Sequence, residues 1–206
     1  YEGVDIEGMG ATGLITYMRT DSLRISDVAK EEAAQYILNR FGEKFLPAKP
    51  RVFKTKSNAQ DGHEAIRPSM PSLSPEDVKA SLTSDQFKLY NLIWNRFMAS
   101  QMSDCIQKTT QAEISAKEYI FKASGYYVDF EGFTTLYVES KDTEEEKSTQ
   151  LPPLEKDMPV KCKELKKNQH FTQPPARYTE ASLIKALEEY GIGRPSTYAA
   201  TITTIT

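Results

Sequence analysis

The strongest constraint on the fold is a change in residue pattern near position 103. Before it, apolar side chains recur every three or four residues over positions 28–41 and 84–100, which is the spacing of amphipathic helices. After it, positions 104–138 hold short runs of β-branched and aromatic residues separated by turn residues, which are typical of strands. Helical spacing returns from residue 181. Strands gathered between two helical blocks predict an α+β fold made of several pieces.

Local end signals define the first helical block. Ser26 can cap a helix that runs to residue 41, and Gly42 is placed to end it. Ser74 and Pro75 form a strong helix start, because serine caps well and proline suits the first helical position. A longer helix over residues 84–100 presents a broad apolar stripe to the core, formed by Phe87, Tyr90, Leu92, Ile93, Trp94, Phe97 and Met98.

The rest of the chain predicts strands and then two more helices. A helix over residues 181–190 ends at Gly191, and residues 194–196 turn into another helix start. Residues 14–17 suit a short strand or extended loop, and the proline-rich residues 47–71 suit a loop. The pattern predicts a meander of strands at 111–114, 119–123, 126–130 and 133–138, with further strands at 158–165 and 170–172.

Composition is that of an ordinary globular chain. Of the 206 residues, 39% are apolar and 27% are charged, and no apolar run approaches the roughly 18 residues that a membrane span needs. Cys105 and Cys162 are too few and too far apart for a zinc site, and they indicate reduced thiols in a cytoplasmic protein. The first residue is not methionine and residues 201–206 continue a Thr/Ile-rich stretch, so we expect a piece of a longer protein.

The distribution of charge is more informative than its sum. A net charge of −3 argues against a general polyanion binder. Two segments are nevertheless basic: residues 49–67 hold five Lys/Arg against two Asp/Glu, a local +3, and residues 161–177 hold five against one, a local +4. Such segments can bind a phosphate backbone, but they also occur on proteins that never bind DNA. Charge alone therefore does not decide whether this chain binds a nucleic acid.

The first candidate for chemistry is Tyr17 with Arg19. Residues two apart lie on the same side of an extended segment, so the guanidinium could favour the phenolate and grip a phosphate. A tyrosine activated in this way can attack a phosphodiester. The chain has 11 tyrosines, however, and a tyrosine near an arginine is common by chance.

The second candidate is His63, one of only two histidines, within residues 61–68. Its imidazole could donate to a phosphate oxygen or shuttle a proton. Local chemistry alone favours a simpler interpretation, in which the segment is a loop that turns into a helix capped by His63. The other histidine, His170, falls in a predicted strand and is given no role.

The third candidate is the turn at residues 191–197, which contains Arg194 and Thr197. Backbone N–H groups and hydroxyls before a helix form a ready anion site, although simple helix–turn–helix linkers outnumber such sites. Two acidic pairs, at residues 5–7 and 129–131, look like metal motifs but contain no Asp-x-Asp. We therefore predict no metal site in this chain.

The residues of these segments and their order along the chain, taken together, are more specific for one family than any single segment. Residues 13–22 read GLITYMRTDS and resemble the active-site segment of type IA DNA topoisomerases, in particular the bacterial topoisomerase I group. Residues 61–68 look like that family's histidine motif, and residues 173–178 with 190–199 are similar to its later DNA-contacting segment. The blocks follow the family's order from residue 13 to residue 199, which identifies the chain as an internal fragment of such an enzyme.

The resemblance implies roles for individual residues. Tyr17 would be the nucleophile that cuts one DNA strand and forms a 5′-phosphotyrosyl link, and Arg19 would hold the scissile phosphate. His63 would be a supporting active-site residue. Arg194 and Thr197 would contact the DNA backbone or shape its groove. Cleavage, strand passage and religation would relax negatively supercoiled DNA without ATP, in an isomerase associated with the nucleoid in the cytoplasm.

The resemblance also implies an organisation into domains. Residues 1–103 would be a helical, winged-helix-like domain that bears the tyrosine. Residues 104–173 would belong to a β-rich arch, and residues 174–206 would start a truncated helical DNA-binding domain. The family's Toprim domain, with its acidic Mg²⁺ cluster, has no counterpart in this sequence, and neither do its zinc ribbons. Mg²⁺ would therefore serve only the full-length enzyme, and we expect the fragment alone to be inactive in relaxation.

Two other classes of function stay open from the residues alone. In a non-enzymatic nucleic-acid-binding module, Tyr17 would be a core or stacking residue. A purely structural fragment would show no salt-dependent DNA binding. A tyrosine recombinase would require further Arg/His residues, and the chain has only two histidines.

Overall fold

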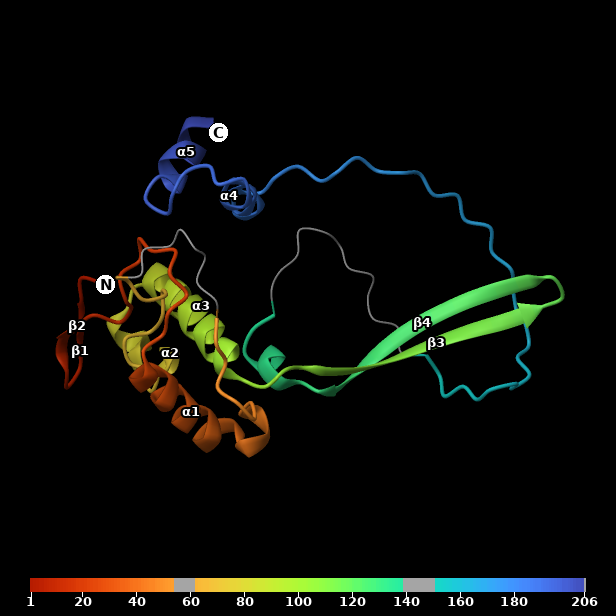
Figure 1. Cartoon of the computed structure of the whole chain (residues 1–206), viewed down its shortest axis with the longest axis horizontal. Coiled ribbons are helices and arrows are strands. Elements are labelled where there is room, and N and C mark those ends of the chain that lie inside the picture. The colour runs from red at the N-terminus through yellow and green to blue at the C-terminus, as the bar shows by residue number, and fades with distance from the viewer. Residues whose placement is uncertain (54–61, 139–150, 206) are drawn as a thin grey trace.

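The computed structural model describes residues 1–53, 62–138 and 151–205, and within them the chain combines helices with two small antiparallel sheets. Figure 1 shows a helical body at the N-terminal end, a long two-stranded hairpin that projects from it, and a pair of helices at the C-terminal end. Residues 151–179, which contain neither helix nor strand, run past the hairpin toward that pair. The expected α+β class is confirmed at this coarse level.

The helical body is built on α1 (Asp27–Phe41) and α3 (Ser84–Gln101), with the short helix α2 (Pro75–Val78) between them in sequence. Short 3-10 turns follow α1, at Glu43–Phe45, and α2, at Lys79–Ser81. The apolar sides of the helices meet in one core. Each large apolar side chain buried there stabilises the fold by about 1.5–3 kcal/mol. The buried apolar members are Ile6, Leu14, Ile25, Ala29, Ala33, Ile37, Val78, Tyr90, Trp94, Phe97, Met98 and Met102.

The ends of α1 and α2 lie where the sequence predicts them. The Ser26 side chain accepts a hydrogen bond from the N–H of Ala29, which satisfies one of the free donors of the first turn. Gly42 ends α1 with a φ of 93°, in the region that favours glycine. Ser74 and Asp77 form a capping box at the start of α2. These ends are confirmed because capping depends only on neighbouring residues.

Helix α3 buries the centre of the predicted apolar stripe, while the other members of the stripe are partly buried or exposed. The Tyr90 hydroxyl donates to the carbonyl oxygen of Leu73 at 2.7 Å, and the Trp94 Nε1 donates to that of Pro71 at 3.0 Å. Burial raises the pKa of Tyr90 above its usual value, so its hydroxyl stays protonated and acts as a donor. Leu92, which we predicted to join the core, is 51% exposed because it lies on the outer side of the helix.

A small hairpin near the N-terminus was not predicted. Strand β1 (Val4–Ile6) pairs antiparallel with β2 (Gly10–Thr12), with Val4 opposite Thr12. The acidic residues 5–7 that resemble a metal motif lie on this hairpin and its turn. Three-residue strands are too short for alternation to be visible in the sequence.

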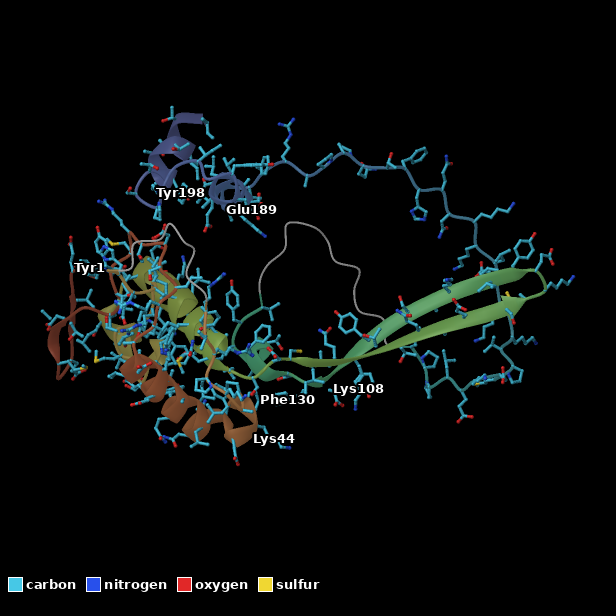
Figure 2. All side chains as sticks on the ribbon, viewed as in Figure 1. Tyr1, Lys44, Lys108, Phe130, Glu189 and Tyr198 are labelled. Atoms are coloured by element: carbon cyan, nitrogen blue, oxygen red, sulfur yellow. The ribbon has the colours of Figure 1, made fainter. Side chains whose placement is uncertain are left out.

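The predicted strand meander is a single long hairpin. Strand β3 (Ile106–Ala116) pairs antiparallel with β4 (Tyr119–Phe130) through the two-residue turn at 117–118. The two segments predicted at 119–123 and 126–130 are one strand, because Gly125 stays in the ladder opposite Thr110. The glycine that we took for a turn therefore continues the strand. Figure 2 shows how far the ribbon extends from Phe130, at its base, past Lys108 to the free turn.

Three other predicted strands are absent from the described residues. Residues 133–138 begin inside a 3-10 turn, Gly132–Thr135, in which the N–H of Leu136 donates to the carbonyl of Phe133. Residues 158–165 and 170–172 are extended but pair with no other strand in the part of the chain that the structure describes. An apolar run forms a strand only where a partner edge is available, so His170 does not lie in a strand.

The C-terminal helices follow the prediction closely. Helix α4 (Glu180–Glu189) starts at a Thr179–Ser182 capping box and is followed by Gly191, whose φ is 70°. The turn after it leads into α5 (Tyr198–Ile205). Figure 2 marks this pair at Glu189 and Tyr198. None of the helices in the described ranges is long and apolar enough to cross a membrane.

The root of the hairpin is fixed to the helical body by a dense set of contacts. The N–H of Ser103 donates to the carbonyl of Phe45 at 2.8 Å, and the N–H of Phe133 donates to that of Ser103 at 2.9 Å. The rings of Phe45 and Phe130 lie 4.9 Å apart. Gly132 has a φ of 52°, and a Cβ there would lie 2.4 Å from the carbonyl oxygen of Asp104.

We expect Gly132→Ala to destabilise the helical body. A left-handed residue with a Cβ costs about 1–2 kcal/mol, and the collision with backbone atoms adds about 1–3 kcal/mol. Gly8→Ala is the matched control, because Gly8 also has a positive φ of 77° but no atom within 4 Å of the added Cβ. Urea unfolding followed by the fluorescence of Trp94, the single tryptophan, measures both. Equal losses in the two variants would contradict the close approach at Gly132.

Candidate functional site

Tyr17 follows an extended segment that is joined to a part of the chain some fifty residues away. Ile15 forms an isolated antiparallel bridge with Pro68. Next to it, the N–H of Thr16 donates to the carbonyl oxygen of Arg67 at 3.0 Å. This confirms the extended conformation predicted for residues 14–17 and adds the partner segment that supports it.

The hydroxyl of Thr16 is the centre of this junction. It donates to the carbonyl oxygen of Ala65 at 2.7 Å, and it accepts a hydrogen bond from the N–H of Arg67 at 3.0 Å. A hydroxyl that both donates and accepts a hydrogen bond fixes two backbone segments relative to each other. The residue directly before Tyr17 therefore sets where the segment that carries His63 lies.

The structure brings Tyr17 and His63 together. Their rings are stacked, with centroids 5.3 Å apart and planes inclined by 26°. Tyr17 also contacts the ring of Tyr1 edge-on, with centroids 5.4 Å apart and planes inclined by 68°. The Tyr17 side chain is half-buried, so neighbouring rings hold its orientation while part of it stays accessible.

The interpretation of His63 as a helix cap is wrong. No helix starts directly after it: residues 62–74 contain only turns, bends, irregular backbone and the bridge at Pro68. The N–H of Ala65 instead donates to the carbonyl oxygen of Arg24 at 2.8 Å, so this segment is held by both sides of the loop that contains Tyr17. Asp61, the first residue of the predicted motif, lies outside the described residues.

Arg19, two residues after Tyr17, is exposed. Among the described residues its guanidinium has no hydrogen-bond or ion-pair partner, and it does not bond to the Tyr17 hydroxyl. Its five N–H donors are therefore free to bind an anion that approaches Tyr17.

Arg67, which we counted in the basic surface of residues 49–67, is buried. Its side chain is 9% exposed, and it forms an ion pair with Glu64 in which Nη2 and Oε2 are 2.5 Å apart. Nη1 donates to the carbonyl oxygen of Pro68 at 2.8 Å, and Nη2 also donates to the hydroxyl of Ser26 at 3.3 Å. The contact with Ser26 cannot be found from the sequence, since that residue lies 41 positions earlier.

Arg194 and Thr197 lie in the turn between α4 and α5. The hydroxyl of Thr197 accepts from the N–H of Arg194 at 2.9 Å and donates to its carbonyl oxygen at 3.1 Å, so it closes the turn. Both residues are exposed. Within the described residues neither contacts Tyr17, Arg19 or His63, so the third candidate segment is separate from the first two.

The family resemblance implies a magnesium site in the full-length enzyme, so we asked whether side chains of this chain could hold the ion. Across residues 1–53, 62–138 and 151–205, no group of three or more His, Cys, Asp or Glu side chains is placed to hold a metal ion. In the acidic pair 129–131, Asp129 is bonded to Lys108 at 2.8 Å. The described residues therefore do not fit a metal ion.

We expect Thr16→Val to destabilise the helical body by about 1–3 kcal/mol, because it leaves the Ala65 carbonyl and the Arg67 N–H without their shared partner. Thr12→Val is the control: among the described residues the Thr12 hydroxyl bonds only to the carbonyl of Gly10, at an exposed site in β2, and its loss should cost less than about 0.5 kcal/mol. Urea unfolding followed by tryptophan fluorescence compares them. A Thr16→Val variant as stable as the control would show that the junction does not depend on this hydroxyl.

Two comparisons relate the chain to known proteins. A family model described as DNA topoisomerase matches residues 1–206. The chain is also similar to the solved structure of full-length topoisomerase I from Thermotoga maritima, with 37% sequence identity and a TM-score of 0.72. The match covers 100% of this chain and 32% of that chain. The chain therefore belongs to the DNA topoisomerase family, in its type IA branch.

Proposed function

We propose that Tyr17 is the nucleophile of a single-strand DNA transesterification carried out by the longer protein to which this chain belongs. The observation that supports this most directly is the arrangement at Tyr17. A half-buried phenol is stacked on His63 and stands two residues before Arg19, which is exposed and has no partner among the described residues. A core tyrosine in a simple binding module would be enclosed, as Tyr90 is at 3% exposure.

The proposed reaction exchanges one phosphoester for another. The phenolic oxygen of Tyr17 attacks the phosphorus of a backbone phosphodiester and loses its proton. The bond from phosphorus to the 3′-oxygen breaks, and that oxygen takes up a proton as the free 3′-hydroxyl. The product is a 5′-phosphotyrosyl link, whose bond energy allows the strand to be resealed by the reverse step. The exchange therefore requires no ATP.

Arg19 and His63 have different roles in this proposal. The free guanidinium of Arg19 would bind the scissile phosphate in bidentate fashion and stabilise the charge that develops on its oxygens. His63 lies against the face of the Tyr17 ring, and a stacked imidazole cannot accept the phenolic proton directly. We therefore assign His63 to holding the ring and donating to the phosphate, rather than to direct deprotonation of Tyr17.

The same proposal assigns a role to each part of the chain. Residues 1–103 would form the winged-helix-like domain that carries the tyrosine. Residues 104–173, with the projecting hairpin, would form part of the arch through which strands pass, and residues 174–206 would begin a DNA-binding domain. The exposed Arg194 and Thr197 would contact the DNA backbone there.

The remaining parts of the reaction belong to the longer protein. We propose that its Toprim domain supplies acidic side chains and Mg²⁺ across an interface with Tyr17. The substrate would be a single-stranded segment of negatively supercoiled DNA, in the nucleoid of the cytoplasm. The chain spans about a third of the related topoisomerase, which leaves room for such domains.

We expect Tyr17→Phe in the full-length protein to abolish the covalent protein–DNA adduct, because phenylalanine keeps the ring but lacks the attacking oxygen. Incubation with labelled single-stranded DNA followed by denaturing electrophoresis measures the adduct. Tyr1→Phe is the control, because Tyr1 contacts Tyr17 only through its ring. An adduct that survives Tyr17→Phe would rule out this nucleophile and leave the chain as a DNA-binding module.

We expect the 206-residue chain alone not to relax negatively supercoiled plasmid, with or without added Mg²⁺, because the described residues offer no set of metal ligands. Agarose electrophoresis of the plasmid measures relaxation, and the full-length protein in the same buffer is the positive control. Relaxation by the purified chain would refute the proposed dependence on a second domain.

A further inference from the structure

Arg67 is an arginine beside the proposed active site of a DNA enzyme, yet its surroundings are those of a buried anchor. The residue is 8% exposed. Nη1 donates to the carbonyl oxygen of Pro68, while Nη2 donates to the Ser26 hydroxyl and is paired with the Glu64 carboxylate. The remaining donor, Nε, is buried and has no hydrogen-bond partner among the described residues. A DNA phosphate could not reach this guanidinium without dismantling the segment around it.

The partners of Arg67 connect the His63 segment to the rest of the helical body. Glu64 is the residue directly after His63, and Ser26 is the cap of helix α1. The backbone of Arg67 pairs with Thr16, the residue directly before Tyr17. One residue thus touches, through its side chain and its main chain, the neighbours of both stacked rings.

We propose that Arg67 is a positioning residue, which holds His63 against the ring of Tyr17 and does not bind DNA. This inference rests on the proposed function of Tyr17 and His63 and extends it to a residue outside the reacting groups. The rigid fork of the guanidinium suits this task, since it bonds to several acceptors at fixed angles. Lysine keeps the charge but cannot reproduce that set of contacts.

The first test is kinetic and uses the full-length protein with a labelled single-stranded oligonucleotide. Arg67→Lys should lower the rate constant of adduct formation by up to about 10²-fold, the scale of a small misplacement of reacting groups. The dissociation constant for the oligonucleotide and its salt dependence should stay unchanged, because no phosphate contact is lost. Arg40→Lys, at an exposed position in the last turn of α1, is the control and should alter neither quantity.

A double-mutant cycle separates positioning from general stability. In a His63→Ala background, Arg67→Lys should cause little further loss of rate, because the residue it positions is gone. Losses that multiply in the double variant, an unchanged rate in Arg67→Lys, or weaker binding with a shallower salt dependence would each overturn the proposal.

The second test does not depend on activity. The chain has two histidines, and the exposed His170 provides an internal reference for the ring signals of His63 in an NMR spectrum. The stacked Tyr17 ring should displace the His63 signals upfield. Arg67→Lys should return them toward those of His170, with folding confirmed by circular dichroism. Glu64→Gln, which weakens the same ion pair, serves if Arg67→Lys does not fold.

The two tests distinguish a failure of the role proposed for Arg67 from a failure of the function proposed for Tyr17. His63 signals that stay unchanged in a folded Arg67→Lys or Glu64→Gln variant would overturn the role of Arg67 and leave the proposed function intact. An adduct that survives Tyr17→Phe would overturn the proposed function, while the His63 signals would still decide whether Arg67 holds the two rings together.

Discussion

The junction between residues 14–16 and 65–69 is the contact on which the rest of the site depends. Closing a loop of about fifty residues costs conformational entropy, and the hydrogen bonds of Thr16 with Ala65 and Arg67 offset part of that cost where the site is built. The stacking of Tyr17 on His63 is a consequence, because each ring belongs to one side of the junction. The site is therefore formed by tertiary structure that a few polar groups determine.

Two arginines near this junction illustrate how burial decides what a charge can do. The guanidinium of Arg19 is exposed and without a described partner, so an incoming anion does not have to displace another group. Arg67 is enclosed and paired, and removing one member of such a pair leaves an uncompensated charge in a poorly solvated place. Counting Arg67 as basic surface hides this difference, because its charge is buried and paired with that of Glu64.

The hairpin shows the same dependence on a few close contacts. An isolated two-stranded ribbon is only marginally stable, and both faces of β3 and β4 are largely exposed. Its base is held by backbone hydrogen bonds at Ser103 and by the packing of Phe45 on Phe130. Gly132 is required there because the backbone passes too close for any side chain. The ribbon therefore projects in a direction set by the helical body.

The helices and their ends followed from local residue patterns, since Ser26, Gly42 and Ser74 act on residues within one turn of themselves. It also indicated Tyr17, Arg19 and His63 as one family's motifs, but not their arrangement. Tertiary contacts were needed to show that residues 119–130 form one strand, that residues 133–138 form none, that His63 caps no helix, and that Arg67 is buried. Strand pairing and side-chain burial depend on partners far along the chain, and local residue patterns do not specify those partners.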